Sequence, residues 1–282
     1  MKEKLIEILK VLTYYPRKVV DILLFYFYFK NKNDWSILRQ FSNRPVLIVG
    51  NGPSLNKTPL NKIKEGYVSI GMNKINLLFE KNSWRPDIIT CVNGFVINQN
   101  KKYFNKTEKI LILPIRAFYL GIKPRKNILF VNLKDQNKVE KNIEKVLSTG
   151  CTVTFTALQI AAYLDATSVS IVGVDHSFVV EKVSVNAAEV ALRSKNNAGV
   201  QKFNGDDVNH FSKDYFKNQF WGLPDLDGSE LLYSIAKKYF DAIKVPITDY
   251  TLDGKLNIFN KRDVNELCEL VSETLIETNS SN

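Results

Sequence analysis

Runs of consecutive apolar residues recur along most of the chain, separated by polar or turn-forming segments. Short runs bounded by turn signals are typical of buried strands, whereas longer periodic patterns indicate helices. The pattern predicts strands at 45–50, 67–73, 86–93, 109–113, 127–131, 169–175 and 246–248. It predicts helices at 75–79, 139–147, 153–164, 231–243 and 264–275. Apolar strands that alternate with helices indicate the α/β class, with a doubly wound, mostly parallel, Rossmann-like sheet covered on both faces.

In such folds a ligand binds beyond the carboxyl ends of the strands. The segments to examine first are therefore the loops at 50–55, 71–73, 91–94 and 173–177. Residues 180–222 are polar and irregular, and we expect them to form a long insertion or lid.

The first 32 residues differ from the rest of the chain. Residues 19–29 form an apolar run that contains one Asp and many Phe and Tyr, and seven basic and two acidic side chains flank it within residues 1–32. A bilayer-spanning helix needs about 20 apolar residues, so this run is too short to cross a membrane. No small-residue cleavage site follows, which argues against a signal peptide. Two interpretations stay open: an amphipathic helical segment in the membrane interface, or a helix packed on the protein's own core. We expect residues 1–40 to form this segment and residues 41–282 the catalytic domain.

Composition narrows the class of protein. Hydrophobic residues make up 45% and charged residues 24%, which is typical of a globular chain and argues against disorder. The net charge of +10 favours an anionic partner, although a Lys- and Asn-rich composition explains it equally well, and no nucleic-acid-binding motif is present. Three separated Cys and only two His argue against a disulfide framework, a zinc ribbon or a multi-His metal site. We therefore expect no bound metal and a reducing compartment.

The loop Gly50-Asn51-Gly52-Pro53-Ser54 carries the clearest chemical signal. It follows a predicted strand, and its glycines permit close backbone approach to a ligand. Pro53 suits the first position of a helix, whose free N–H groups attract phosphate. The loop is neither a dinucleotide fingerprint nor a Walker A loop, since Leu55 stands where a Gly is needed and no Gly-Lys-Ser/Thr follows. An ordinary tight turn is the alternative.

Polar residues at other strand ends extend this candidate site. Asn51, Asn73 and Asn93 each stand at or just after a predicted strand end, and Asn suits sugar and base edges because it both donates and accepts, though Asn is also a common turn residue. His176 follows Asp175 at another strand end and faces the same region.

His210 lies in a polar stretch with carboxylates such as Asp206 and Asp207 nearby, which suits a general base, although a surface or capping His is equally compatible. Asp225-Leu226-Asp227 can be read as a D-x-D metal motif, but a turn in which Asp227 or Ser229 caps the next helix is the better interpretation.

Together these motifs resemble a known group of proteins. The segment 46–55 resembles the opening of bacterial sialyltransferases of glycosyltransferase family 42, and also of a wider set that includes motility accessory factors and 6-hydroxymethylpterin diphosphokinase-like domains. Ser148-Thr149-Gly150 and the strand 171–175 are shared by both groups, whereas segments 209–216 and 253–259 are more similar to the wider set. The resemblance covers roughly residues 45–262.

The resemblance implies a role for each matching residue. Asn51, Gly52 and Ser54 match the nucleotide phosphate and ribose site, Asn73 and Asn93 match donor-binding asparagines, and Thr149 and Gly150 match the turn that contacts the cytidine and sugar. Asp175 and His176 fall at the donor site, and His210 matches the general base. The sialyltransferases carry two tyrosines after the strand at 171–175, and residues 176–180 contain none, which leaves the donor sugar open.

The expected activity is that of an inverting glycosyltransferase that uses a CMP-activated sugar, a sialic acid-like nonulosonate or Kdo, to modify a surface glycan such as lipopolysaccharide or capsule. The resemblance implies no cofactor and no catalytic metal, with the CMP-sugar as co-substrate. We expect a glycan or glycolipid acceptor, no nucleic acid, and a cytoplasmic protein held on the inner face of the membrane through residues 1–32. The alternatives are a 6-hydroxymethylpterin diphosphokinase-like enzyme, which needs ATP, Mg²⁺ and carboxylates such as Asp87 or Asp175, and a non-catalytic member of the fold.

Overall fold

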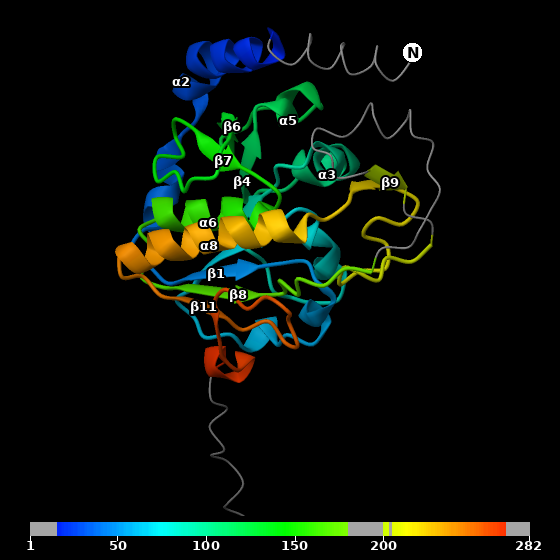
Figure 1. Ribbon diagram of the computed structural model, residues 1–282. Helices are drawn as coiled ribbons and strands as arrows, with labels where there is room; N and C mark the ends of the chain where they lie inside the picture. The colour runs from blue at the N-terminus through cyan, green and yellow to red at the C-terminus, as the bar shows by residue number, and fades with distance from the viewer. Residues whose placement is uncertain (1–15, 180–199, 203–204, 269–282) are drawn as a thin grey trace, which may run out of the picture.

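The computed structural model describes residues 16–179, 200–202 and 205–268, and one large parallel sheet organises them (Figure 1). The strand order is β12-β11-β8-β1-β2-β3-β4-β5, and each neighbouring pair is parallel. The strands are β1 (Val46–Val49), β2 (Val68–Met72), β3 (Ile88–Thr90), β4 (Ile110–Pro114), β5 (Ile128–Val131), β8 (Val169–Val172), β11 (Ile247–Asp249) and β12 (Asn260–Lys261). This architecture confirms the predicted α/β, doubly wound fold class.

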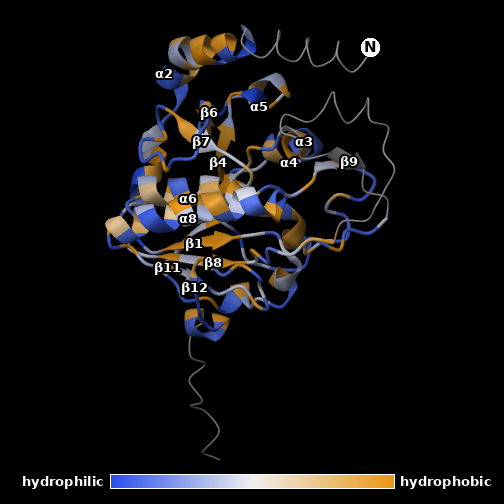
Figure 2. Ribbon diagram, viewed as in Figure 1, coloured by the Kyte–Doolittle hydropathy of each residue, from blue (hydrophilic) through white to orange (hydrophobic). Residues whose placement is uncertain are grey.

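The central strand shows why the sequence folds this way. β1 pairs with β2 on one side and β8 on the other, and all four of its residues are buried. Val46 and Ile48 belong to the core on one face of the sheet, and Leu47 and Val49 belong to the core on the other. A strand buried on both faces needs a continuous apolar run, and Figure 2 shows β1 and β8 in hydrophobic colours.

Two long helices cover one face of the sheet. α6 (Val153–Tyr163) and α8 (Leu226–Ala242) lie side by side there. α6 is buried over nine of its eleven residues, which explains why its sequence is apolar on all sides. The other helical elements are short: π-helical η1 (Phe25–Phe29), α2 (Lys30–Lys32), η2 (Trp35–Phe41), η3 (Pro53–Asn56), η4 (Leu60–Lys62), η5 (Ile75–Glu80), α3 (Gly94–Gln99), α4 (Lys101–Phe104), α5 (Arg116–Tyr119) and η6 (Val264–Leu267).

Two small sheets flank the large one. β6 (Leu133–Asp135) pairs in parallel with β7 (Leu147–Thr149), and β9 (Val200–Lys202) pairs antiparallel with β10 (Phe220–Gly222). The predicted helix at 139–147 is wrong, because this segment forms turns that lead into β7. The buried Gln159 side chain of α6 accepts hydrogen bonds from the backbone N–H groups of Glu140 and Ser148. These two backbone donors therefore have partners although the segment is not a helix.

Other boundaries differ from expectation in smaller ways. α8 begins at Leu226, five residues before the predicted start, because Asp225 rather than Asp227 or Ser229 caps it. The predicted helix at 264–275 begins as the single turn η6, and its remainder past residue 268 lies outside the described residues. The predicted lid at 180–222 is described only at 200–202 and 205–222, where residues 205–219 form bends and turns.

The N-terminal helical segment packs on the protein's own core through one side, as one of the two interpretations of the sequence expects. Residues 16–32 are helical, and Phe25 and Phe29 are buried, with the Phe29 ring 4.4 Å from that of Phe130. Leu24 is partly buried against the same core, and the other large apolar side chains of the segment are exposed, most of all Phe27 at 82%. No helix among the described residues is long and apolar enough to cross a membrane.

Candidate functional site

A cavity of about 150 Å³ opens at the carboxyl ends of β1 and β8. This is where the strand order reverses. On one side of β1 the sheet continues with β2 to β5, and on the other side it continues with β8, β11 and β12. The lining residues come from the loops after β1, β2 and β8, from the N-terminal ends of α6 and α8, and from the turn that carries His210. They include Asn51, Gly52, Asn73, Thr152, Asp175, His176, His210, Asp225 and Tyr233.

The loop after β1 is pressed against the loop after β8. A side chain at Gly50 would collide with the carbonyl oxygen of Gly173, and one at Gly52 with the carboxylate of Asp175, so both positions require glycine. Ser54 donates its N–H to Asp175 Oδ1 at 3.0 Å and its hydroxyl to Asp175 Oδ2 at 2.7 Å. Burial raises the pKa of Asp175, and the two bonds from Ser54 oppose that shift. The donors that the sequence assigns to a ligand phosphate are thus bonded to the chain's own carboxylate.

The N-terminal ends of two helices, α6 and α8, also line the cavity. Thr152, Val153 and Thr154 line it at the start of α6, where the neutral Thr152 hydroxyl caps the N–H of Thr154. At the start of α8 the cap is the Asp225 carboxylate, which offsets the helix dipole there. The end of α6 is therefore the better position for an anionic group.

Two asparagines direct carbonyl oxygens to this region. Asn51 donates from Nδ2 to the carbonyl oxygen of Met72 at 3.1 Å, which fixes the orientation of its amide. Its Oδ1 is buried without a partner among the described residues, as is Oδ1 of Asn73, whose backbone is left-handed at φ 53°. Both side chains line the cavity, and a buried unpaired acceptor favours a ligand that donates from a hydroxyl or amino group.

Besides Ser54, three predicted site residues are not part of the cavity wall. Asn93 caps α3, accepting from the N–H of Phe95 at 2.9 Å. Thr149 ends β7, and Gly150 packs closely against Leu232. Their predicted roles in donor binding stay predictions, and the neighbouring Cys151 and Thr152 are the residues of this turn that reach the wall.

Both histidines of the protein line the cavity, and each is bonded to a carboxylate. His176 has a left-handed backbone at φ 54°, and its Nε2 lies 2.9 Å from Glu230 Oε1. His210 Nδ1 lies 2.8 Å from Oδ2 of Asp207, a residue only 3% exposed. Since a carboxylate can only accept, Nδ1 of His210 carries a proton, and Nε2 is the nitrogen that can accept one when the ring is neutral.

Packing fixes the ring of His210 on several sides. It stacks on Tyr215, with ring centroids 4.0 Å apart and planes within 5°. Its backbone is held on the loop after β1, because Phe211 N–H donates to the Asn51 carbonyl oxygen at 3.0 Å. The arrangement can accept a proton from a hydroxyl group placed in the cavity.

Sequence reasoning missed several residues of this wall. Thr152 and Tyr233, whose hydroxyl oxygens lie 3.1 Å apart, had no distinguishing signal. Asp207 was one of two adjacent aspartates, and the spacing alone did not show that it, rather than Asp206, bonds His210. Asp206 instead forms exposed ion pairs with Lys213 and Lys217.

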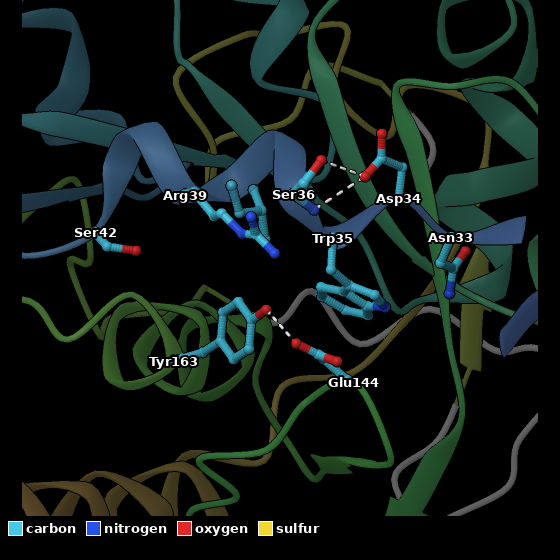
Figure 3. A pocket seen from close by; sticks show the side chains of 9 residues that line it. Asn33, Asp34, Trp35, Ser36, Arg39, Ser42, Glu144 and Tyr163 are labelled. Atoms are coloured by element: carbon cyan, nitrogen blue, oxygen red, sulfur yellow. Dashed lines mark hydrogen bonds between the residues drawn. The ribbon is translucent and has the colours of Figure 1, made fainter. Parts of the chain in front are cut away.

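A second cavity of about 450 Å³ lies at the other end of α6 (Figure 3). Trp35, Arg39, Glu144 and Tyr163 line it, and the Tyr163 hydroxyl donates to Glu144 Oε1 at 2.6 Å. Burial and this bond raise the pKa of Tyr163. No residue that the sequence singled out lies there. Among the described residues, no three His, Cys, Asp or Glu side chains converge as a metal site would require.

Comparisons with known proteins show a similarity to one family and to solved structures. The model of the family "6-hydroxymethylpterin diphosphokinase MptE-like" matches residues 26–181, more than half of the chain. A search of the curated proteins finds no match. Among solved structures, the sialyltransferase CstII from Campylobacter jejuni, in complex with a substrate analogue, CMP-3FNeuAc, is similar with a TM-score of 0.43 and 10% sequence identity. That match covers 81% of this chain and 89% of the other.

Proposed function

The chain belongs to the 6-hydroxymethylpterin diphosphokinase MptE-like family, and within it we propose that this protein is an inverting glycosyltransferase that uses a CMP-activated sugar. The proposed donors are a sialic acid-like nonulosonate or Kdo, and the proposed acceptor is a glycan or glycolipid such as lipopolysaccharide or capsule. The motifs at 46–55, 148–150 and 171–175, which resemble those of sialyltransferases, support this choice.

The observation that carries the proposal is the His210–Asp207 pair, which shares one cavity with the N-terminal end of α6. Nε2 of His210 takes the proton of an acceptor hydroxyl as that oxygen attacks the anomeric carbon. Asp207 keeps the ring in the required tautomer and stabilises the imidazolium that forms. The bond from the anomeric carbon to the phosphate oxygen breaks, and the positive end of α6 stabilises the departing nucleotide phosphate.

Donor binding falls to the polar wall between these two groups. The unpaired Oδ1 atoms of Asn51 and Asn73 accept from ribose, cytosine or sugar groups. Asp175 and Gly52 shape the wall, because Ser54 ties the loop after β1 to the loop after β8. These residues need no cofactor and no metal for the roles proposed.

The first test is a thermal-shift titration with CMP, CDP, UDP, GDP and ATP, each with and without Mg²⁺. A ligand that binds only the folded state raises the melting temperature by mass action. Stabilisation by CMP without metal supports the transferase and leads to assays with CMP-nonulosonates and CMP-Kdo. In those assays His210→Ala should lower turnover by about 10²-fold or more, and near-normal turnover would remove His210 from the role of base.

The family name itself favours a second candidate, a pterin diphosphokinase. That reaction needs ATP and Mg²⁺, with carboxylates near the phosphates. Of the aspartates that the sequence offered, Asp175 lines the cavity, whereas Asp87 is bonded to Ser69 away from its wall. Stabilisation by ATP only in the presence of Mg²⁺ would refute the transferase in favour of this enzyme, and failure to bind any nucleotide would favour a non-catalytic member.

We also propose that the protein binds the inner face of the cell membrane from the cytoplasm through its N-terminal segment. Val19, Val20, Leu23, Tyr26 and Phe27 are each about half exposed or more. Phe118 and Tyr119 of α5 add exposed aromatic rings next to this segment, because the rings of Phe29 and Phe118 lie 5.5 Å apart. Lys30 and Lys32 place their ammonium groups over the rings of Tyr26 and Tyr28. Aromatic rings beside lysines are typical of proteins that lie in the interface of anionic membranes.

Sedimentation with lipid vesicles tests this surface. The wild-type protein should sediment with vesicles that contain phosphatidylglycerol and much less with pure phosphatidylcholine. Phe27→Glu should weaken binding, because it places a carboxylate on the proposed membrane face. Leu231→Glu is the matched control, since Leu231 is 52% exposed on α8. If both variants sediment with the vesicles to the same extent as the wild type, the proposal is contradicted.

A further inference from the structure

Lys74 is a buried lysine immediately after the cavity-lining Asn73, and it is only 4% exposed. Its ammonium group donates to the carbonyl oxygen of Tyr215 at 2.5 Å and to Gln219 Oε1 at 2.7 Å. It also lies over two aromatic faces, 4.6 Å from the ring centroid of Phe216 and 5.3 Å from that of Tyr215. A buried ammonium is costly unless such groups compensate it, so its retention at this point calls for a reason.

The partners of Lys74 all belong to the turn that carries His210. Besides the two bonds of the ammonium group, the backbone N–H of Lys74 donates to the Tyr215 hydroxyl at 3.2 Å. One residue at the end of β2 therefore holds Tyr215 at both its carbonyl oxygen and its hydroxyl. Tyr215 is fully buried, and its ring is the one on which His210 stacks.

We propose that Lys74 is the positioning residue for His210: it binds Tyr215 and Gln219 and so fixes the stacked Tyr215 ring that sets the plane of the imidazole. Asp207 fixes one edge of the imidazole and Tyr215 one face, and together they determine where Nε2 points. Lys74 is not among the residues that line the cavity. The catalytic consequence rests on the proposed role of His210 as base.

The effect on turnover follows from this geometry. Lys74→Met keeps much of the apolar volume and removes the two bonds of the ammonium group. It should lower kcat roughly 10- to 100-fold, because small displacements of a catalytic group are costly. The KM for the donor should stay unchanged, since the cavity wall is intact.

A spectroscopic test needs no substrate. The protein has only two histidines, so labelling them with ¹³C at Cε1 gives two resonances, which His176→Gln assigns. The stacked Tyr215 ring should shift the His210 resonance upfield in the wild type. Lys74→Met should remove much of that shift, and Gln219→Leu, which removes one acceptor only, should move it less in the same direction. Lys217→Met, an exposed lysine of the same turn, is the control and should leave it in place.

The outcomes separate the two proposals. An unmoved His210 resonance in both Lys74→Met and Gln219→Leu overturns the positioning role, whatever the activity. A resonance that moves as expected supports the positioning role, even if no nucleotide binds and the transferase proposal fails. If Lys74→Met does not fold, Gln219→Leu carries the test.

Discussion

Replacing Lys74 with methionine should change how the stability of the protein depends on pH. Burial lowers the pKa of Lys74 from its ordinary value of 10.5 to about 8. Between these two values the unfolded chain holds a proton that the folded chain has released. The stability of the wild type therefore rises with pH in this window relative to the variant. The penalty for burying the charged form is complete below about pH 8 and is lost as pH rises to about 10.5.

The size of the effect follows from the same pair of values. One pKa unit corresponds to about 1.4 kcal/mol. Between about pH 8 and about pH 10.5 the free energy of unfolding of the wild type should therefore rise by about 3 kcal/mol relative to that of Lys74→Met. Urea unfolding of both proteins from about pH 7 to about pH 10.5 measures this difference, and the other lysines and tyrosines cancel because they are common to both. A difference that stays constant with pH would show that Lys74 is not desolvated as its burial indicates.

Three further predictions concern the cavity and the core. Gly52→Ala should destabilise the fold by about 1–3 kcal/mol and lower nucleotide affinity, because the added methyl group displaces the Asp175 carboxylate. Chemical unfolding measures the first effect and the thermal-shift titration the second, and unchanged values would contradict the close approach of Gly52 to Asp175. Asp207→Asn should lower kcat by about 10²-fold or more with little change in donor KM, which steady-state kinetics checks, and wild-type turnover would deny it the orienting role. Phe29→Ala should cost about 3–5 kcal/mol, whereas Phe27→Ala, at 82% exposure, should change the unfolding free energy by less than about 0.5 kcal/mol; equal effects would mean that the two faces of the helical segment are not distinct.

The fold could be predicted from the sequence wherever a short run of neighbouring residues was enough to indicate the element. The strands were recognisable because burial on both faces demands unbroken apolar runs, as in Val46–Val49. The segment 139–147 was not, since its conformation depends on a side chain of α6, Gln159, that is distant in sequence. The early start of α8 likewise depended on which of several nearby polar residues accepted the capping bond.

The candidate site was predictable in position but not in its internal bonding. Residues 50–52 of the loop after β1, Asn73, Asp175 and both histidines do meet in one cavity, because the carboxyl ends of parallel strands share an edge. Ser54, Asn93, Thr149 and Gly150 are not part of its wall. That Asp175 takes the donors of Ser54 is a contact across 121 residues, which no local pattern encodes. The role proposed for α6 was hidden for a related reason, since the N-terminal end of a helix acts through its backbone rather than its side chains.

The N-terminal helical segment has one more consequence for the proposed enzyme. Because Phe25 and Phe29 belong to the same core cluster as Leu47 and Val49 of β1, the segment is part of the folded body rather than a tether. A bilayer held by its outer face would therefore lie at a constant height and tilt relative to the catalytic cavity. Only acceptors whose reactive hydroxyl extends from the lipid surface to the height of the cavity could then reach His210. The length of the glycan, as well as its chemistry, would then select the substrate.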